Sequence, residues 1–261
     1  MKKAFIYLVV FMAIQIVIGG VVAGLWQLIA GNSDVTATRM VTITVVVGII
    51  TIAIFLLMRW AEVSPRWLRT RPWTVLAWSV VAALGALIPS AALQEMMPEL
   101  PNWAENEFEA LLGKHVGYLA IGLLAPLSEE IVVRGAILKE LLKSSRLSPW
   151  GAIIISAVLF ALVHMNPVQM PHAFLIGLFL GWMYWRTGSI LPGVAYHWAN
   201  NSAAFVLYHF FPDPDMKLSD MFMGNNTNVI LAIVFSLLIL LPALYQLNLW
   251  MKRAEEGVQE V

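Results

Sequence analysis

Long apolar runs separated by short polar segments dominate the chain. A helix needs roughly 20 residues to cross the hydrocarbon core of a bilayer. Eight runs approach or exceed this length, and the sixth is short enough to be tilted or partly re-entrant. The pattern therefore predicts an all-α fold, a polytopic membrane protein with about eight transmembrane helices. The predicted helices cover residues 4–30, 41–58, 73–93, 116–142, 149–165, 173–187, 190–210 and 228–250.

The composition supports a membrane environment. Of the 261 residues, 60% are hydrophobic and only 12% are charged, about half the charged fraction of a soluble domain. The net charge is zero, which offers no electrostatic reason to bind nucleic acid. The chain has no cysteine, which excludes thiol catalysis, disulfides and thiolate metal sites. Repeats and low-complexity linkers are absent from the sequence, so residues 1–261 are interpreted as one integral membrane domain.

The basic residues predict the orientation. Cytoplasmic loops of membrane proteins carry an excess of lysine and arginine. With eight crossings and the N-terminus inside, twelve of the 16 basic residues fall on the cytoplasmic side, three fall outside and Arg134 lies within a run. We therefore expect both termini in the cytoplasm and the protein in a cell membrane, the bacterial inner membrane. The three outer residues are Arg39, Lys114 and Lys217, and the cytoplasmic set is Lys2, Lys3, Arg59, Arg66, Arg69, Arg71, Lys139, Lys143, Arg146, Arg186, Lys252 and Arg253.

One outer segment carries a helical pattern of its own. Residues 103–112 alternate acidic and apolar side chains with helical spacing, after the prolines Pro98 and Pro101. This pattern is typical of a short amphipathic helix that lies on a membrane surface.

The fourth run contains charged side chains where lipid would surround them. Glu129, Glu130 and Arg134 lie near its centre. An ionisable group there costs about 2.5–3.5 kcal/mol on insertion scales, so such groups are usually paired and functional. Glu130 and Arg134 are four residues apart and share one helix face. Glu129 is turned by about 100° and can face a different neighbour.

Two later runs add imidazole and amide groups. His164 ends the fifth run, on the same face as Phe160. His197 lies in the seventh run and shares a face with Asn201, although Asn200 remains an alternative to Asn201. If the three polar stripes face one interior point, they enclose a polar cavity that contains a carboxylate, two imidazoles and an amide.

These residue types are suited to hydrolysis by activated water. A carboxylate such as Glu129 in apolar surroundings can take a proton from water, and a neighbouring His164 can share that proton. His197 and an asparagine amide can donate hydrogen bonds to a developing oxyanion. The set Glu129, His164 and His197 is also a donor set for a divalent metal such as zinc, which would lower the pKa of the water directly.

Purely structural explanations exist for some of these residues. Glu130 and Arg134 could be a buried ion pair that only supports the fold. A single intramembrane histidine often makes an interhelical hydrogen bond, but nothing structural requires Glu129, His164 and His197 together. Two other hydrolase classes are excluded by the sequence, because it lacks a His-Glu-x-x-His pair and the predicted helices lack aspartate.

The three motifs together carry a resemblance. Glu129-Glu130-Ile-Val-Val-Arg134, Phe160-Ala-Leu-Val-His164 and His197-Trp-Ala-Asn-Asn201 occur in order, each within a predicted helix. This pattern resembles the CPBP family (CAAX protease and bacteriocin-processing, or Abi) of intramembrane proteases, related to the Ras-converting CAAX prenyl endopeptidase. The resemblance covers roughly residues 116–210, taken as the catalytic core.

The resemblance implies a fold and a set of roles. It implies eight helices around a conical cavity, with Glu129 and His164 activating water and with His197 and Asn201 binding the oxyanion. Glu130 and Arg134 would orient the site. The implied function is an intramembrane endopeptidase that cleaves a membrane-associated protein or peptide, with zinc as an open question. The alternatives are a non-catalytic immunity or peptide-binding scaffold of the same fold and a proton-coupled carrier. A carrier is less favoured because the chain shows no paired internal repeats.

Overall fold

Helices form all the regular structure in the described part of a computed structural model, which comprises residues 1–64, 73–213 and 216–259. Each of the eight predicted runs is helical, so the predicted all-α class is confirmed. The α-helices are α1 (Lys2–Ala30), α2 (Ala37–Leu57), α3 (Trp73–Glu95), α4 (Glu105–Leu112), α5 (Ala125–Glu129), α6 (Lys139–Leu142), α7 (Pro149–Val163), α8 (Met170–Thr187), α9 (Leu191–Phe210), α10 (Leu218–Met221) and α11 (Asn226–Gln259).

The described structure contains fewer helices of membrane-spanning length than the sequence pattern predicts. Among the described residues, five helices are long and apolar enough to cross a bilayer, and α7 is apolar but shorter. The count of eight crossings therefore stays a prediction for the fifth, sixth and seventh runs. The five helices are Lys2–Ala30, Ala37–Leu57, Trp73–Glu95, His115–Leu142 and Asn226–Met251.

Local capping explains where several helices begin and end. The Thr36 side chain accepts a hydrogen bond from Arg39 N at the start of α2, and Ser148 accepts one from Gly151 N at the start of α7. Such caps satisfy amide groups that have no partner within the helix. At the other end, Gly31 after α1 and Gly188 after α8 adopt left-handed conformations, which stop a helix.

The fourth run departs from a regular α-helix. It consists of a 3₁₀ turn, His115–Gly117, followed by π-helical Leu119–Leu124, α5, π-helical Glu130–Leu138 and α6. Every residue from Glu130 to Leu138 is buried, so this is the central helix of the molecule. π-Helical segments are rare and often occur at functional sites. Here the second π-helical segment begins at Glu130, directly after Glu129 at the end of α5.

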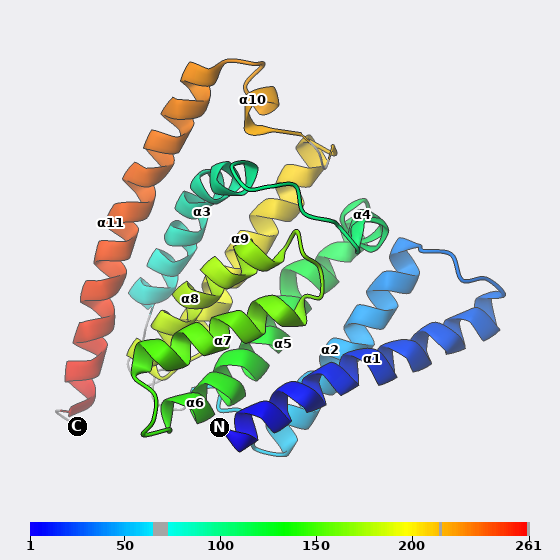
Figure 1. The fold of residues 1–261 in the computed structure, drawn as a ribbon, viewed down its shortest axis with the longest axis horizontal. Coiled ribbons are helices and arrows are strands. Elements are labelled where there is room, and N and C mark those ends of the chain that lie inside the picture. Colours follow the sequence, from blue (N-terminus) through cyan, green and yellow to red (C-terminus); the bar gives the residue numbers. More distant parts are fainter. Residues whose placement is uncertain (65–72, 214–215, 260–261) are drawn as a thin grey trace.

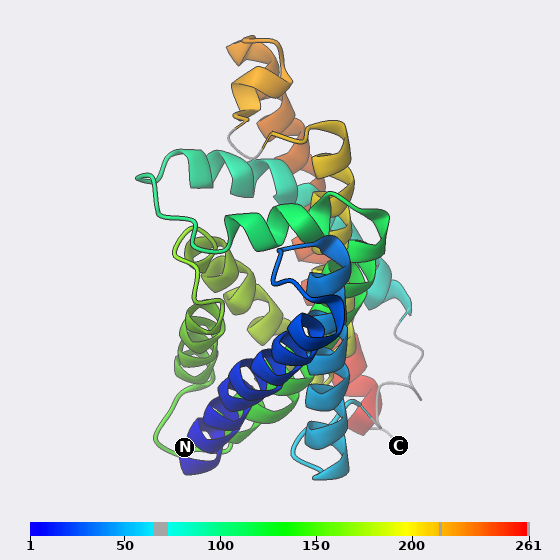
Figure 2. The same cartoon turned by 90° about the vertical axis from the view of Figure 1, so that its right-hand side faces the viewer.

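The other helices surround this central one. α1 pairs with α2 and packs on the π-helical segment Glu130–Leu138, while α3 packs between α9 and the long α11 (Figure 1). α7 and α8 form an antiparallel hairpin beside the centre. The start of α1 and the C-terminal end of α11 lie at the same end of the molecule in both views (Figure 2).

The predicted outer segment forms a helix of the expected kind. α4 begins at Glu105, two residues later than predicted, and buries Leu111 while Glu105 stays exposed.

Five of the basic residues that predict the orientation have side chains outside the described part of the structure. Arg66, Arg69 and Arg71 lie outside the described residues, as do the side chains of Lys252 and Arg253.

Candidate active site

A buried ion pair anchors the site. Arg134 Nη1 lies 2.8 Å from Glu130 Oε1, and both side chains are fully buried. The pair spans one turn of the central helix, as the spacing predicted. Arg134 also donates to the Gly177 carbonyl oxygen on α8 at 3.3 Å and lies 4.3 Å from the ring centroid of Phe160 on α7. The guanidinium therefore links three helices, and its charge is neutralised inside the protein.

His197 lies between the two glutamates. Its Nδ1 is 3.2 Å from Glu130 Oε1, and its Nε2 is 3.8 Å from Glu129 Oε2. The first contact is a hydrogen bond and the second is longer than one. A carboxylate oxygen only accepts, so Nδ1 carries a proton and donates it to Glu130. Arg134, Glu130, His197 and Glu129 thus form a continuous chain of polar contacts across the central helix and α9.

A glycine on α9 makes this approach possible. A Cβ atom at Gly193 would lie 2.7 Å from Glu130 Oε2, closer than such contacts allow. Gly193 is one turn before His197, so α9 can reach the central helix only where its side chain is absent. Oε2 has no hydrogen-bond partner among the described residues.

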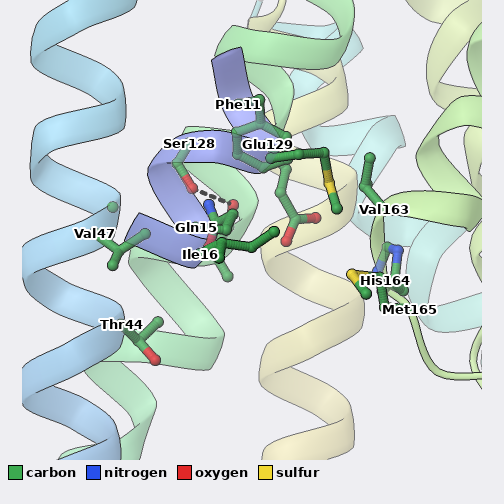
Figure 3. A pocket seen from close by; sticks show the side chains of 13 residues that line it. Phe11, Gln15, Ile16, Thr44, Val47, Ser128, Glu129, Val163, His164 and Met165 are labelled. Atoms are coloured by element: carbon green, nitrogen blue, oxygen red, sulfur yellow. Dashed lines mark hydrogen bonds between the residues drawn. The ribbon is translucent and has the colours of Figure 1, made fainter. Parts of the chain in front are cut away.

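Glu129 and His164 line one cavity. Its volume is about 230 Å³, which is room for several water molecules. Figure 3 shows the Glu129 carboxylate reaching into this space from the central helix, with His164 at the end of α7 on another wall. The side chain of Glu129 is 22% exposed, in contrast to the fully buried Glu130. Of the two glutamates, Glu129 is therefore the one whose carboxylate is accessible from the cavity.

The tautomer of His164 follows from its backbone contact. Nδ1 lies 2.8 Å from the Phe160 carbonyl oxygen, which can only accept a hydrogen bond. Nδ1 of His164 therefore carries the proton, and in the neutral ring Nε2 has a free lone pair. An acceptor of this kind beside a cavity with room for water can orient a water molecule or take its proton.

Asn201 makes different contacts from those expected. Its amide donates to the Ile121 carbonyl oxygen at 3.0 Å, and its side-chain oxygen accepts from Asn200 at 3.2 Å. Pro126 explains why that carbonyl is open. In a π-helix each N–H bonds to the carbonyl five residues earlier, as Ala125 does with Ala120, but Pro126 has no N–H for Ile121.

The structure thus brings together some of the predicted residues and not others. Glu129, Glu130, Arg134 and His197 are in contact, and His164 shares the cavity of Glu129. His197 and Asn201 are absent from the cavity lining. The expected polar cavity is also mainly apolar, with Phe11, Met12, Ile16, Val47, Gly48, Ala125, Val163 and Met165 lining it beside Gln15, Thr44, Ser128, Glu129 and His164.

The site does not fit the metal hypothesis. Within the described residues, no group of three or more His, Asp or Glu side chains is arranged to hold a metal ion. His197 uses its Nδ1 for Glu130, and the 3.8 Å contact between its Nε2 and Glu129 Oε2 brings together only two potential ligands, fewer than the three or four of a protein zinc site.

Sequence reasoning missed two features of the site. The three sequence motifs do not include His172, which lies half-buried in the first turn of α8. The three motifs also lie outside the first two helices, yet α1 and α2 supply more than half of the cavity lining. A glutamine in the middle of α1 was the available sequence signal.

Comparison with known proteins bears on the same region. The family model described as type II CAAX prenyl endopeptidase Rce1-like matches residues 112–203, which contain all three motifs. The resemblance to the CAAX protease family is confirmed. No curated protein and no solved structure matches the chain. The matched family is a family of membrane proteases, and several long apolar helices accompany the match, which together indicate a multi-pass membrane protein.

Proposed function

We propose that this protein is an intramembrane endopeptidase that hydrolyses a peptide bond with water activated by Glu129 and His164. The observation that carries the proposal is their shared cavity beside the chain of contacts Arg134, Glu130, His197 and Glu129. The substrate would be a membrane-associated protein or peptide, because the cavity is bounded by membrane-type helices.

The reaction follows from the positions of the protons. Glu129 takes a proton from a cavity water, while His164 Nε2 orients that water. The resulting hydroxide attacks the carbonyl carbon, and the negative charge moves to the carbonyl oxygen. When the C–N bond breaks, Glu129 gives its proton to the leaving nitrogen, which yields a free carboxylate and a free amine. The enzyme returns to its starting state without a covalent intermediate.

His197 and Asn201 are proposed to stabilise the oxyanion. His197 is held by Glu130 through Nδ1, so a second proton on Nε2 would point toward the Glu129 side of the site. The Asn201 amide has two N–H groups, and Ile121 takes one of them. Its second N–H remains for the substrate, one helical turn from His197. Such donors typically contribute about 10²–10³ in kcat each.

The deciding experiment compares Glu129→Gln with Glu109→Gln. Both changes remove one carboxylate, but Glu109 lies on α4, outside the cavity. The substrates are short, internally quenched peptides with apolar central residues, assayed in detergent. We expect Glu129→Gln to lower kcat by about 10²–10⁴, the usual contribution of a general base, with an unchanged melting temperature. Equal cleavage by wild type and Glu129→Gln would refute the mechanism and favour the peptide-binding scaffold.

A further inference from the structure

Gln15 is an isolated polar side chain in the middle of α1. It lies near the centre of a 29-residue apolar helix, and no other amide side chain occurs in α1 before Gln27. A polar group at this depth is costly in lipid unless it has a partner or faces water. Among the described residues, Gln15 has no hydrogen-bond partner, and its side chain is exposed. Its position therefore calls for an explanation outside the fold itself.

The cavity of the candidate active site explains why a polar side chain lies at this position. Gln15 lines the cavity that Glu129 and His164 share (Figure 3). Its neighbours on α1, Phe11, Met12 and Ile16, are apolar and line the same cavity. One amide therefore stands within an apolar wall that faces the proposed water-activating residues.

The chemistry of this wall matches an extended apolar peptide. A glutamine amide carries two donors and one acceptor, so it can pair with both the C=O and the N–H of a peptide backbone. The surrounding apolar groups would accept hydrophobic side chains, and a backbone buried among them needs hydrogen bonds. Ser128 already donates to the Ala125 carbonyl oxygen, so it is less available for this role.

We propose that Gln15 is a positioning residue that hydrogen-bonds the backbone of an extended, apolar peptide substrate next to the bond to be cleaved. This inference rests on the proposed peptidase function and adds the substrate wall to it. Gln15 lies outside the family match at residues 112–203. The matched region supplies the reactive groups, and the first two helices set which peptides can reach them.

The test is Gln15→Met, with Gln27→Met as the matched control. Methionine has a similar length but makes no comparable hydrogen bond, and Gln27 lies on the same helix outside the cavity. With the same quenched peptides, we expect Gln15→Met to raise KM about three- to tenfold with a nearly unchanged kcat. This is the effect of losing one hydrogen bond that is equally strong in the enzyme–substrate complex and in the transition state. Gln27→Met should behave like wild type, and both variants should keep the wild-type melting temperature.

A change in the peptide separates hydrogen bonding from packing. Replacing one peptide amide by an ester removes its N–H, and the replacement is moved along the probe, leaving the scissile bond intact. At one position, the ester should raise KM for wild type but have no further effect on Gln15→Met, because the two changes remove the same contact. Equal effects of every ester on both proteins would overturn the proposal.

Failure of the underlying function has a different signature. If wild type cleaves none of the peptides, the peptidase proposal is contradicted. Fluorescence anisotropy with the same peptides then tests Gln15 by binding alone. Weaker binding to Gln15→Met than to Gln27→Met supports the peptide contact, and equal binding refutes it.

Discussion

At the scale of single residues, the two adjacent glutamates have opposite environments. Glu130 is fully buried, paired with Arg134 and bonded to His197. Glu129 is partly exposed and lines a cavity. A buried, neutralised carboxylate is unsuited to proton exchange, whereas an accessible one beside an unprotonated ring nitrogen is suited to it. The helix turns by about 100° between consecutive residues, which is enough to place one glutamate in the buried ion pair and the next in the cavity wall.

The buried pair yields a prediction about stability. Glu130→Gln leaves Arg134 charged and without its counter-ion inside the protein. Breaking such a pair typically costs about 3–5 kcal/mol, so the melting temperature in detergent should fall clearly. Cleavage should fall as well, because His197 loses its carboxylate partner.

A double variant is the control for that interpretation. Glu130→Gln combined with Arg134→Met removes the unpaired charge and should recover part of the lost melting temperature without restoring full activity. If Arg134→Met gives no recovery, the stability loss does not come from the unpaired charge.

At the scale of helices, a close approach between α9 and the central helix holds the site together. Gly193 leaves space for Glu130 Oε2, and one turn later His197 reaches both glutamates. Asn201, a further turn along, bonds the Ile121 carbonyl that Pro126 leaves open. Successive turns of α9 are therefore matched to the irregular geometry of the central helix.

This contact predicts the effect of a single methyl group. Gly193→Ala places Cβ against Glu130 Oε2 and should cost about 1–3 kcal/mol through overpacking. Activity should fall with stability, because the shift moves His197 as well. Gly24→Ala is the matched control, since nothing lies within 4 Å of its Cβ position and alanine favours a helix by up to about 1 kcal/mol. Melting temperature and peptide cleavage, measured for both variants, check the prediction. A Gly193→Ala protein as stable and active as Gly24→Ala would contradict the tight contact.

At the scale of the whole molecule, the helix arrangement bears on orientation. The beginning of α1 and the end of α11 lie at one end of the molecule (Figures 1 and 2). Met1 also shares a surface pocket with Lys143, Ser145 and Arg146 of the loop before α7. Two of the segments that predicted a cytoplasmic side, the start of α1 and the loop before α7, therefore lie close together in space, while the acidic α4 lies away from both termini (Figure 1).

The orientation can be tested by chemical labelling because the chain has no cysteine. Ser145→Cys and Glu105→Cys each place a single thiol at an exposed position, one in the loop before α7 and one at the start of α4. We expect a membrane-impermeant maleimide to label Glu105→Cys in intact cells, and Ser145→Cys only after permeabilisation. The opposite pattern would invert the predicted topology, and labelling of both in intact cells would contradict the number of crossings between them.

The sequence by itself determined the helical class, the position of each helix and the residues worth examining. Apolar runs of membrane length have few alternatives to helix, because a backbone in lipid must satisfy its own hydrogen bonds. Charged residues in such runs are costly, which made Glu129, Glu130 and Arg134 conspicuous. The spacing of Glu130 and Arg134 fixed their pairing, since that contact lies within one helical turn.

Only the tertiary structure decided the contacts between helices. His197 lies 67 residues after Glu130 along the chain, and its position between two carboxylates depends on packing at Gly193. The bond from Asn201 to Ile121 depends on a π-helical irregularity that apolar periodicity does not reveal. The contribution of α1 and α2 to the cavity was equally invisible, because the pattern of one helix says which face is apolar but not which neighbour covers it.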